Sequence, residues 1–532
     1  MIRSAIKNWA FAFKLTVPVF IFFGLYLANH SKELTPTGFI QYDNVSYIAF
    51  AKQYLDADAL HWQYANPFND QELSPIYFQP QTLFFAFLLK MGVPPGIILI
   101  PFTIICALVC FRLMIGIYDL LIEKNEYRVF SIWMFAWGGG VLVISGILFH
   151  FTMPTDHALA GDLFALDPEH GWWGLNAGRA LLFSCEAYYH ALFFGCVFFL
   201  LKRKWLAGLI LMFILLLSHP FTSIELIGII CCWVFIEFII NRRFLPWWFI
   251  SGVTGCLALY TWYYLFYLNQ FPDHRSVADQ YSLNWRLGIY RIIPAYLLVG
   301  ILAIVAIFKK TALSYFNNYA TRLFACWFIV AFLLANHEWF LKARQPIHFT
   351  RGYIWTSLFL LGLPALQQLN AALKNKWGKI GLAGLAVVFF LDNFSWMLIN
   401  STSKATQTST AYITQEHKKI FDYLKKETTN HTLLISNDEL ISYMSTLYTE
   451  AYPWVSHPYT TPFVQTKKSA LNRWMQSGET DPAWAGRKVV FVLRKDGTIN
   501  MQRLFKTFQV THEYDTDNFV IFKCDSLLIK SP

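Results

Sequence analysis

The chain has 532 residues, of which 56% are hydrophobic, 18% aromatic and only 14% charged, and its mean hydropathy is +0.39. Soluble domains carry about 25% charged residues, so this composition excludes a cytosolic enzyme, a disordered chain and a disulfide-bonded scaffold. The formal net charge of +10 comes from short basic runs between apolar stretches, which favours membrane loops over a nucleic-acid partner.

A membrane-spanning helix needs about 20 mostly apolar residues, and the chain contains about eleven such stretches. They are residues 10–28, 97–118, 129–151, 180–201, 205–218, 222–240, 244–268, 289–308, 320–336, 353–369 and 380–400. The first lacks a signal-peptide cleavage site and follows basic residues, so we expect it to remain as an anchor with a cytoplasmic N-terminus. Residues 77–91 are too short for a comfortable span, and we expect them to lie at the membrane interface.

Basic residues gather in four of the loops between these stretches: Lys202, Arg203 and Lys204; Arg242 and Arg243; Lys309 and Lys310; Lys374, Lys376 and Lys379. Lysine and arginine favour cytoplasmic loops. This assignment places the loops 30–96, 152–178, 269–288 and 336–352 on the outer side, together with everything after residue 401. We therefore predict a mainly α polytopic membrane domain over 1–400 and a small extracytoplasmic α/β domain over 401–532.

The expected C-terminal domain shows the periodicity of a soluble fold. A polar linker is predicted at 400–404, and an amphipathic helix at 416–426. Buried strands are expected at 432–436, 488–494 and 518–524, with further helices near 437–447 and 499–507.

The first outer loop carries Asp43 at the start of an amphipathic run that extends to Leu55. Its apolar residues recur at helical spacing, which predicts a helix lying on the membrane surface with a carboxylate at its N-terminal edge. A structural role is the alternative, because aspartate is a preferred N-cap worth about 1 kcal/mol to a helix.

The second outer loop is the most polar region next to the membrane. It contains Asp156 and His157, and it leads through Arg179 into a helix with Glu186 and His190 on one face. These side chains suit a divalent cation, an anionic ligand held by arginine, or a general base. The alternative is a solvated loop anchored at the interface by tryptophans, namely Trp172 and Trp173.

A late outer loop concentrates cationic groups against the positive-inside rule: Lys342, Arg344, His348 and Arg351 fall within ten residues. Phosphate recognition explains this exception, because arginine offers a rigid fork of donors to phosphate oxygens. A charge patch attracted to lipid headgroups is the alternative.

Two further segments carry less weight. The turn from Ser218 to Glu225 either lines the same substrate cavity as these outer loops or only caps a helix. The aromatic segment from Tyr452 to Phe463 lacks a catalytic spacing, and we expect it to pack the C-terminal domain onto the membrane part or to cover an acceptor groove.

An acidic residue after the first span, a surface helix behind it, many spans and an extracytoplasmic tail resemble the GT-C class of integral membrane glycosyltransferases. The layout is similar to that of protein mannosyltransferases and lipid A aminoarabinose transferases, which use a sugar carried on a polyprenyl phosphate. The resemblance implies Asp43 and Asp156 as catalytic residues. It also implies a phosphate site in the late loop, with Arg344 and Arg351. The usual acidic pair is reduced here to Asp43-Asn44.

The resemblance thus implies an inverting transfer from a polyprenyl-phosphate donor to a glycan, lipid or protein acceptor on the outer side of the membrane. Substrate binding is expected at six residues: Arg179, Glu186, His190, Arg344, His348 and Arg351. A divalent cation is left open, with Asp43, Asp156 and His157 as candidate ligands, and no nucleotide cofactor is expected. A bacterial inner membrane suits the chain, although an endoplasmic reticulum protein would look much the same. The alternatives are a transporter or flippase of a lipid-linked precursor and a non-catalytic scaffold in envelope assembly.

Overall fold

The computed structural model describes residues 2–55, 60–123, 125–167, 176–240, 245–283, 285–309, 312–373, 376–402, 410–495, 504–505 and 508–524. Several residues singled out in the sequence lie outside these ranges: Trp172, Trp173, Arg242, Arg243, Lys310, Lys374 and nearly all of the helix expected at 499–507. The chain divides into two compact units. We name residues 1–29, 100–265 and 282–406 the helical unit, and residues 30–99, 266–281 and 407–532 the α/β unit.

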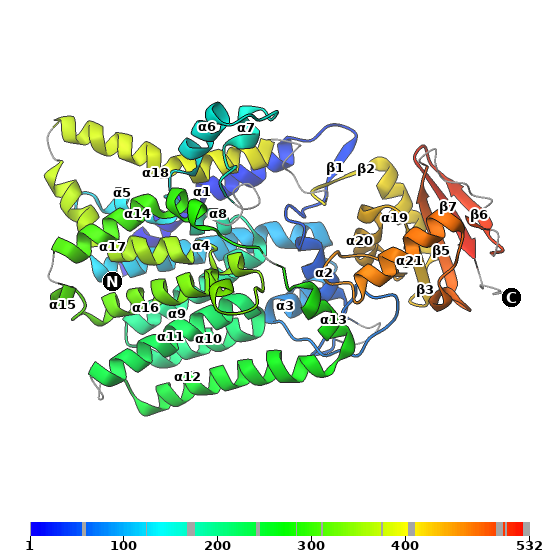
Figure 1. Ribbon diagram of the computed structural model, residues 1–532, viewed down its shortest axis with the longest axis horizontal. Helices are drawn as coiled ribbons and strands as arrows, with labels where there is room; N and C mark the ends of the chain where they lie inside the picture. The colour runs from blue at the N-terminus through cyan, green and yellow to red at the C-terminus, as the bar shows by residue number, and fades with distance from the viewer. Residues whose placement is uncertain are drawn as a thin grey trace. The chain divides into compact units, whose positions relative to one another are not determined.

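The helical unit is a bundle whose long helices run side by side (Figure 1). Its main helices are α1 (Ile2–Ala28), α4 (Pro95–Leu121), α5 (Arg128–Trp137), α6 (Leu142–Thr152), α9 (Ser184–Leu201), α10 (Trp205–Ser218), α11 (Pro220–Ile240), α12 (Trp247–Tyr260), α14 (Ile289–Lys309), α16 (Tyr319–Ala335), α17 (Tyr353–Ala372) and α18 (Lys376–Thr402). Short helical pieces lie between them: α7 (Leu159–Asp162), α8 (Ala177–Ala180), the π-helix η1 (Thr261–Tyr267), α15 (Ala312–Tyr315), η3 (His337–Trp339) and η4 (Pro346–Phe349).

Seven helices of the described chain are long and apolar enough to cross a membrane, and they include α1, α4, α9, α11, α14 and α18. The seventh is α12 with its continuation to Gln270. Helices α5 and α6 pass the same test together as a pair bent by 53°, and α10 and α16 are shorter apolar helices. The protein is therefore an integral membrane protein. All eleven stretches expected from the sequence fall on helices, and the number of crossings stays a prediction.

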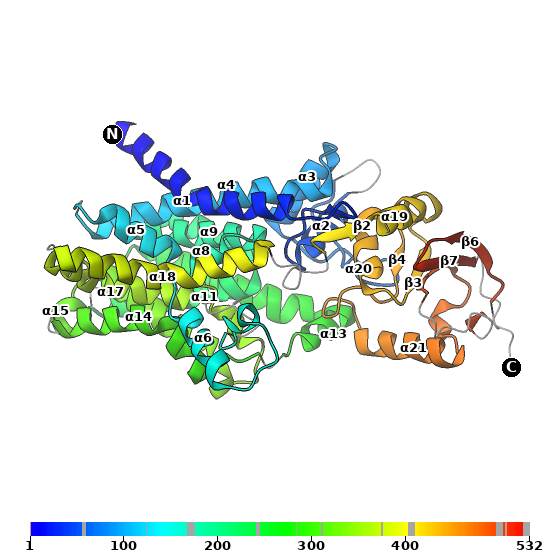
Figure 2. The same ribbon diagram turned by 90° about the horizontal axis from the view of Figure 1, so that it is seen from above.

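Apolar faces hold the helical unit together. Helix α17 packs against α14 and α16, α16 packs against α11, and α10 packs against α9, α11 and α12. Helix α1 lies along α18, as Figure 2 also shows. Large aromatic side chains fill the interior: Trp137, Trp233, Trp327, Trp355 and Trp396 are among the largest fully buried residues.

The α/β unit contains a five-stranded mixed sheet with the order β4-β3-β5-β7-β6. Its strands are β3 (Thr432–Ser436), β4 (Tyr452–Pro453), β5 (Lys488–Arg494), β6 (Thr511–Asp515) and β7 (Phe519–Cys524). Strand β3 is parallel to β4 and β5, while β7 is antiparallel to β5 and β6. The α/β character expected for the C-terminal segment is thus confirmed.

Helices and a second small sheet complete the α/β unit. The helices are α2 (Asn44–Lys52), α3 (Pro80–Lys90), α13 (Pro272–Gln280), α19 (Gln415–Glu427), α20 (Glu439–Tyr448) and α21 (Val464–Ser477). Strand β1 (Leu34–Pro36) pairs antiparallel with β2 (Tyr412–Thr414). Residues of the first long loop and of the C-terminal segment therefore belong to one unit, although the sequence suggested a boundary at residue 400.

Two expectations from the sequence are wrong. Helix α2 does not expose an apolar face for a membrane surface, because Val45, Ile48 and Ala49 are fully buried and the helix packs against α3 and α20. The linker expected from residue 400 is still helical at 400–402, since α18 continues to Thr402. The apolar residues of α2 make contacts within the protein and not with lipid. The polar residues at the end of α18 did not end that helix.

Candidate functional site

Asp43 occupies the N-cap position of α2, but its side chain does not cap the helix. Its backbone is already helical, with φ −68° and ψ −9°, whereas a capping residue usually takes extended angles that direct its oxygen to the first N–H groups. Only the backbone carbonyl of Asp43 accepts a helical hydrogen bond, from the N–H of Tyr47 at 3.2 Å. The carboxylate is 52% exposed, so the capping alternative does not describe its role.

The carboxylate of Asp43 faces His457, a residue of the aromatic segment that was expected to pack the domain or to cover an acceptor groove. Nε2 of His457 lies 3.4 Å from Oδ1 of Asp43, and the His457 side chain is 3% exposed. Because the two residues are separated by 414 positions, no local motif joins them. The aromatic segment around His457 was visible in the sequence, but its contact with Asp43 was not.

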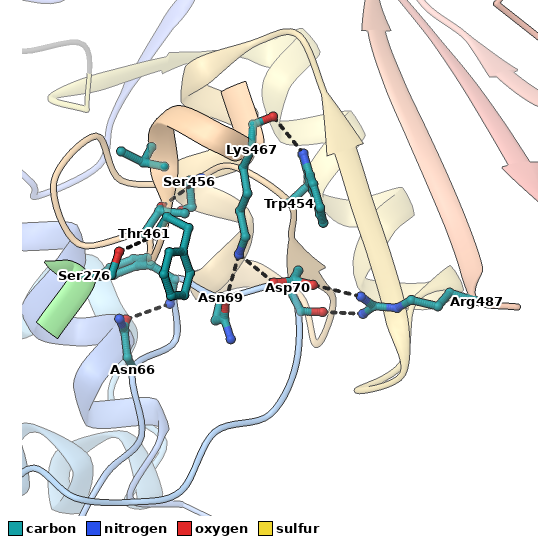
Figure 3. Close-up of polar contacts among 12 residues, drawn as sticks. Asn66, Asn69, Asp70, Ser276, Trp454, Ser456, Thr461, Lys467 and Arg487 are labelled. Atoms are coloured by element: carbon teal, nitrogen blue, oxygen red, sulfur yellow. Dashed lines mark hydrogen bonds and ion pairs between the residues drawn. The ribbon is translucent and has the colours of Figure 1, made fainter. Parts of the chain in front are cut away.

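A polar network anchors the loop next to this pair (Figure 3). Nζ of Lys467 donates to Oδ1 of Asn69 at 2.7 Å and to Oδ1 of Asp70 at 2.5 Å. Arg487 pairs with the other carboxylate oxygen of Asp70 at 3.2 Å, and Asn66 donates to the carbonyl of Thr460 at 2.8 Å. The loop from residue 66 to 70 is thereby fixed to the C-terminal part of the chain.

A second group of functional side chains lies in the helical unit, and we call it the Arg351 cluster: Glu186, His219, His348 and Arg351. Nη1 of Arg351 forms an ion pair with Oε1 of Glu186, and Nη2 donates to Nδ1 of His348 at 2.8 Å. Arg351 is 6% exposed. The structure thus brings together Glu186, which the sequence placed on a helix, with His348 and Arg351 of the late outer loop.

His219 lies beside the same arginine. Its Nε2 is 3.5 Å from Nη1 of Arg351, and its Nδ1 is 2.9 Å from Oγ1 of Thr222. The guanidinium of Arg351 is thus surrounded by two histidine rings and by the carboxylate of Glu186.

The backbone around Arg351 takes unusual conformations that aim its side chain. Gln345, Arg351 and Gly352 have φ values of 49°, 22° and 79°, and the first two are non-glycine residues in a region such residues rarely adopt. Nε2 of His190 lies 2.9 Å from the carbonyl of Arg351, and this contact ties the loop to α9. His190 therefore supports the arginine rather than lining the cluster with it.

Burial controls the charge of the groups outside the spans. Burial, followed by the charge of Arg351, holds the pKa values of His219 and His348 well below their usual range, so both rings are neutral at pH 7. Burial lowers the pKa of Arg179 to about 10, against the opposing effect of Asp167 and Glu186. Arg179 stays protonated at neutral pH and lies within electrostatic range of Arg351.

Several buried polar atoms near this cluster have no hydrogen-bond partner among the described residues. They are Oε2 of Glu186, both carboxyl oxygens of Glu225 and the hydroxyls of Tyr296 and Tyr353. Glu225 interacts electrostatically with Arg351, Tyr296 and Tyr353, and it is fully buried. Since buried polar groups are nearly always hydrogen-bonded, these atoms indicate a place for a polar ligand or for water.

Two other carboxylates within the helices, Asp392 and Glu237, have structural partners. The carboxylate of Asp392 accepts hydrogen bonds from the backbone N–H groups of Gly140, Leu142 and Val143 at 2.8 to 3.1 Å. These N–H groups lie at the break between α5 and α6, and the carboxylate gives them acceptors. Glu237 forms two hydrogen bonds with Arg322 at 2.7 and 2.8 Å. Glu225 differs from both carboxylates, because neither of its oxygens has such a partner among the described residues.

Three further candidates of the outer loops, Asp156, His157 and Arg344, are exposed, unlike the buried Arg351. His157 contacts a different carboxylate, Asp162, at 3.1 Å. Among the described residues, no group of three or more histidine, cysteine and acidic side chains has the geometry of a metal site. The roles of Asp156, His157 and Arg344 stay predictions.

No protein-family model and no curated protein matches this chain. Among solved structures, it is similar to the arabinofuranosyltransferase AftD from Mycobacteria, with 13% sequence identity and a TM-score of 0.50 over 96% of this chain and 40% of AftD. It also matches ArnT from Cupriavidus metallidurans in the apo state, at 11% identity and a TM-score of 0.46, over 95% of this chain and 97% of ArnT. A third match is ArnT bound to undecaprenyl phosphate, at 12% identity and a TM-score of 0.46, over 95% and 96% of the two chains.

The likeness to AftD concerns the fold. It identifies this chain as a polytopic helical membrane protein with a GT-C-like fold and a small α/β part, which confirms the fold class expected from the sequence.

Proposed function

We propose that the protein is a membrane glycosyltransferase that moves a sugar from a polyprenyl-phosphate-linked donor to an acceptor on the outer side of the membrane. The Arg351 cluster carries this proposal: a guanidinium that is 6% exposed lies beside two histidine rings and next to buried polar atoms that have no partner among the described residues. Arginine offers a rigid fork of donors that matches phosphate oxygens. The GT-C-like fold supports the choice of a lipid-linked donor.

In the proposed reaction, the acceptor hydroxyl attacks the anomeric carbon of the sugar and inverts it. Asp43 takes the hydroxyl proton as general base. The bond between the anomeric carbon and the phosphate oxygen breaks, and its electron pair leaves with the polyprenyl phosphate. Arg351, supported by His219 and Arg179, stabilises the charge on that phosphate, and one preorganised donor of this kind is typically worth about 3 kcal/mol in the transition state.

The remaining parts of the proposal follow the sequence expectations. The acceptor is a glycan, a lipid or a protein, and the sugar is a hexose or a pentose. Asp156 orients the acceptor or helps to hold a divalent cation, and the lipid tail of the donor lies between helices. We assign the protein to a bacterial inner membrane, with a cytoplasmic N-terminus and an extracytoplasmic C-terminal segment.

Two arginines of the same loop provide a matched test of the phosphate site. Purified protein in nanodiscs receives a panel of polyprenyl-phosphate sugars with a membrane-lipid and glycan extract, and release of polyprenyl phosphate is measured. We expect Arg351→Ala to lower the rate by about 100-fold or more. The exposed Arg344→Ala serves as the comparison, and we expect a loss of less than about 5-fold, as for a surface cation.

The outcomes separate the two assignments. A large loss in Arg344→Ala with an active Arg351→Ala would move the phosphate site to the exposed arginine. If the wild type binds the lipid-linked donor but releases no polyprenyl phosphate from any donor, the transferase proposal fails. The transporter and scaffold alternatives would then gain support.

A further inference from the structure

We propose that His457, a residue of the C-terminal segment, positions the carboxylate of Asp43 for the transfer reaction. Its Nε2–H holds Oδ1 of Asp43, and the second oxygen, Oδ2, is left to take the proton of the acceptor hydroxyl. This inference rests on the proposed function, in which Asp43 is the general base. His457 acts through Asp43 and does not itself touch the substrate.

The tautomer of His457 follows from its backbone contacts. The N–H groups of Tyr459 and Thr460 both donate to Nδ1, at 3.1 and 3.0 Å. An atom that accepts two N–H groups carries no proton of its own, so the proton of the neutral ring lies on Nε2. That N–H points at Oδ1 of Asp43 across 3.4 Å, a length that commonly shortens when the substrate is bound.

Aromatic rings hold the plane of His457. Its ring centroid lies 5.4 Å from that of Tyr42, 5.3 Å from Tyr443 and 5.5 Å from Phe68. Tyr443 is fixed in turn, because its hydroxyl donates to the carbonyl of Tyr42 at 2.9 Å and lies 2.7 Å from Oγ of Ser46 in α2. The imidazole therefore cannot turn away from Asp43 without disturbing several packed rings.

The network of Figure 3 holds the loops on which this arrangement depends. Asn66 donates to the carbonyl of Thr460, the residue whose N–H sets the tautomer of His457. Lys467 and Arg487 hold Asp70, at the far end of the loop that carries Phe68. Elements distant in sequence thus converge on one imidazole beside a half-exposed carboxylate, which is the construction expected of a positioned base.

The chemical step assigns a clear task to this hydrogen bond. As the acceptor oxygen attacks, its proton passes to Oδ2 of Asp43, and the electron pair of the broken C–O bond goes to the departing phosphate. Without a donor on Oδ1, the carboxylate can rotate about its side-chain torsions and lose the aligned geometry. A misplacement of about 1 Å can lower a rate by about 100-fold.

Two substitutions of His457 separate its donor from its acceptor. In His457→Asn the amide oxygen replaces Nδ1, which keeps the contact with the loop N–H groups and removes the donor to Asp43. In His457→Gln the amide nitrogen replaces Nε2, which keeps that donor. We expect His457→Asn to lower kcat for polyprenyl phosphate release by about 10- to 100-fold with little change in KM, and His457→Gln to recover much of this loss.

A double variant and a surface control complete the kinetic test. If His457 acts only through Asp43, the double variant Asp43→Asn/His457→Asn is no slower than Asp43→Asn alone. His512→Asn is the control, because His512 is an exposed histidine of the same unit whose Nε2 contacts Asp515 at 3.2 Å, and we expect it to keep the wild-type kcat. A wild-type kcat in His457→Asn, or an equal loss in the asparagine and glutamine variants, overturns the inference.

The hydrogen bond itself is tested without turnover. In protein labelled with 15N-histidine, the His457 signals are assigned by their absence in His457→Asn. We expect the wild type to show a protonated Nε2 and a bare Nδ1, with the Nε2 signal shifted in Asp43→Asn. A protonated Nδ1 would overturn the inference even if the enzyme is active. The expected spectrum in a protein without transferase activity would reject the proposed function and leave only the contact.

Discussion

At the residue scale, His348 accepts a hydrogen bond from Arg351 only while its ring is neutral. Burial and the Arg351 charge hold the pKa of His348 well below its usual range, whereas the ring in the unfolded chain protonates below pH about 6.5. The unfolded state therefore binds more protons as the pH falls below this value. The stability that the neutral ring retains above pH 6.5 is lost on acidification.

This linkage predicts a pH dependence that one substitution should reduce. Each histidine of this kind lowers the free energy of unfolding by up to about 1.4 kcal/mol per pH unit below pH 6.5. We expect the apparent unfolding midpoint in detergent to fall less between pH 7.5 and 5.5 in His348→Gln than in the wild type. Parallel curves for the two proteins would contradict the assignment. Other buried histidines, such as His219, contribute equally to both curves.

The candidate residues were only partly predictable. Arg351, His348 and Glu186 stood out because charge is rare next to apolar stretches, and that signal is local in the sequence. Their mutual contacts were not predictable, since they depend on how α9 and α17 pack. His457 gave no signal of its own in the sequence. Its proposed role depends on Asp43, near the other end of the chain, and on two backbone N–H groups that fix its tautomer.

At the element scale, the break between α5 and α6 depends on Asp392. Three backbone N–H groups donate to its carboxylate, and the residue is fully buried. Such hydrogen bonds to a charged group are worth about 1.5 to 3 kcal/mol each. Asp392 is a charged residue within the apolar stretch 380–400. Such charges are usually functional, but here the carboxylate holds the backbone of the break.

Removing this carboxylate should affect stability and leave the chemistry intact. We expect Asp392→Ala to lower the free energy of unfolding by about 3 kcal/mol or more, because buried N–H groups lose their acceptor. Asp392→Asn keeps one acceptor oxygen and should lose less. The measurement is the unfolding midpoint in detergent, with kcat of the folded fraction as control. An Asp392→Ala variant that is as stable as the wild type would contradict this role.

Strong apolar patterns predicted elements well, and weak ones did not. The strands at 432–436 and 488–494 were found from their buried runs, and the structure has β3 and β5 at those bounds. Strand β4 has only two residues, and β6 is polar and mostly exposed, so neither carried a strand pattern. The periodicity of α2 was read correctly as a helix, but one sequence cannot say whether lipid or protein covers its apolar side.

At the scale of the whole molecule, the α/β unit constrains how often the chain crosses the membrane. Its three segments, 30–99, 266–281 and 407–532, form one compact unit, so they must share one side of the membrane. An even number of crossings must then separate each segment from the next. Counting α5 with α6 as one crossing, and including α10, gives six crossings between the first two segments.

The four crossings predicted from the sequence between the second and third segments, at α14, α16, α17 and α18, also make an even number. The eleven crossings expected from the sequence satisfy both conditions, whereas counting only the α5–α6 pair and the longest helices leaves an odd number, five, between the segments 30–99 and 266–281. The short helix α10 therefore crosses if the bent pair does. Which side carries the α/β unit stays a prediction from the positive-inside rule.

The central claim is that Asp43 activates an acceptor for transfer from a lipid-linked sugar. The most direct measurement compares release of polyprenyl phosphate by the wild type and by Asp43→Asn in nanodiscs, with donor binding measured on the same samples. We predict that Asp43→Asn binds donor like the wild type but releases polyprenyl phosphate at least about 100-fold more slowly. Release at the wild-type rate by Asp43→Asn would contradict the account.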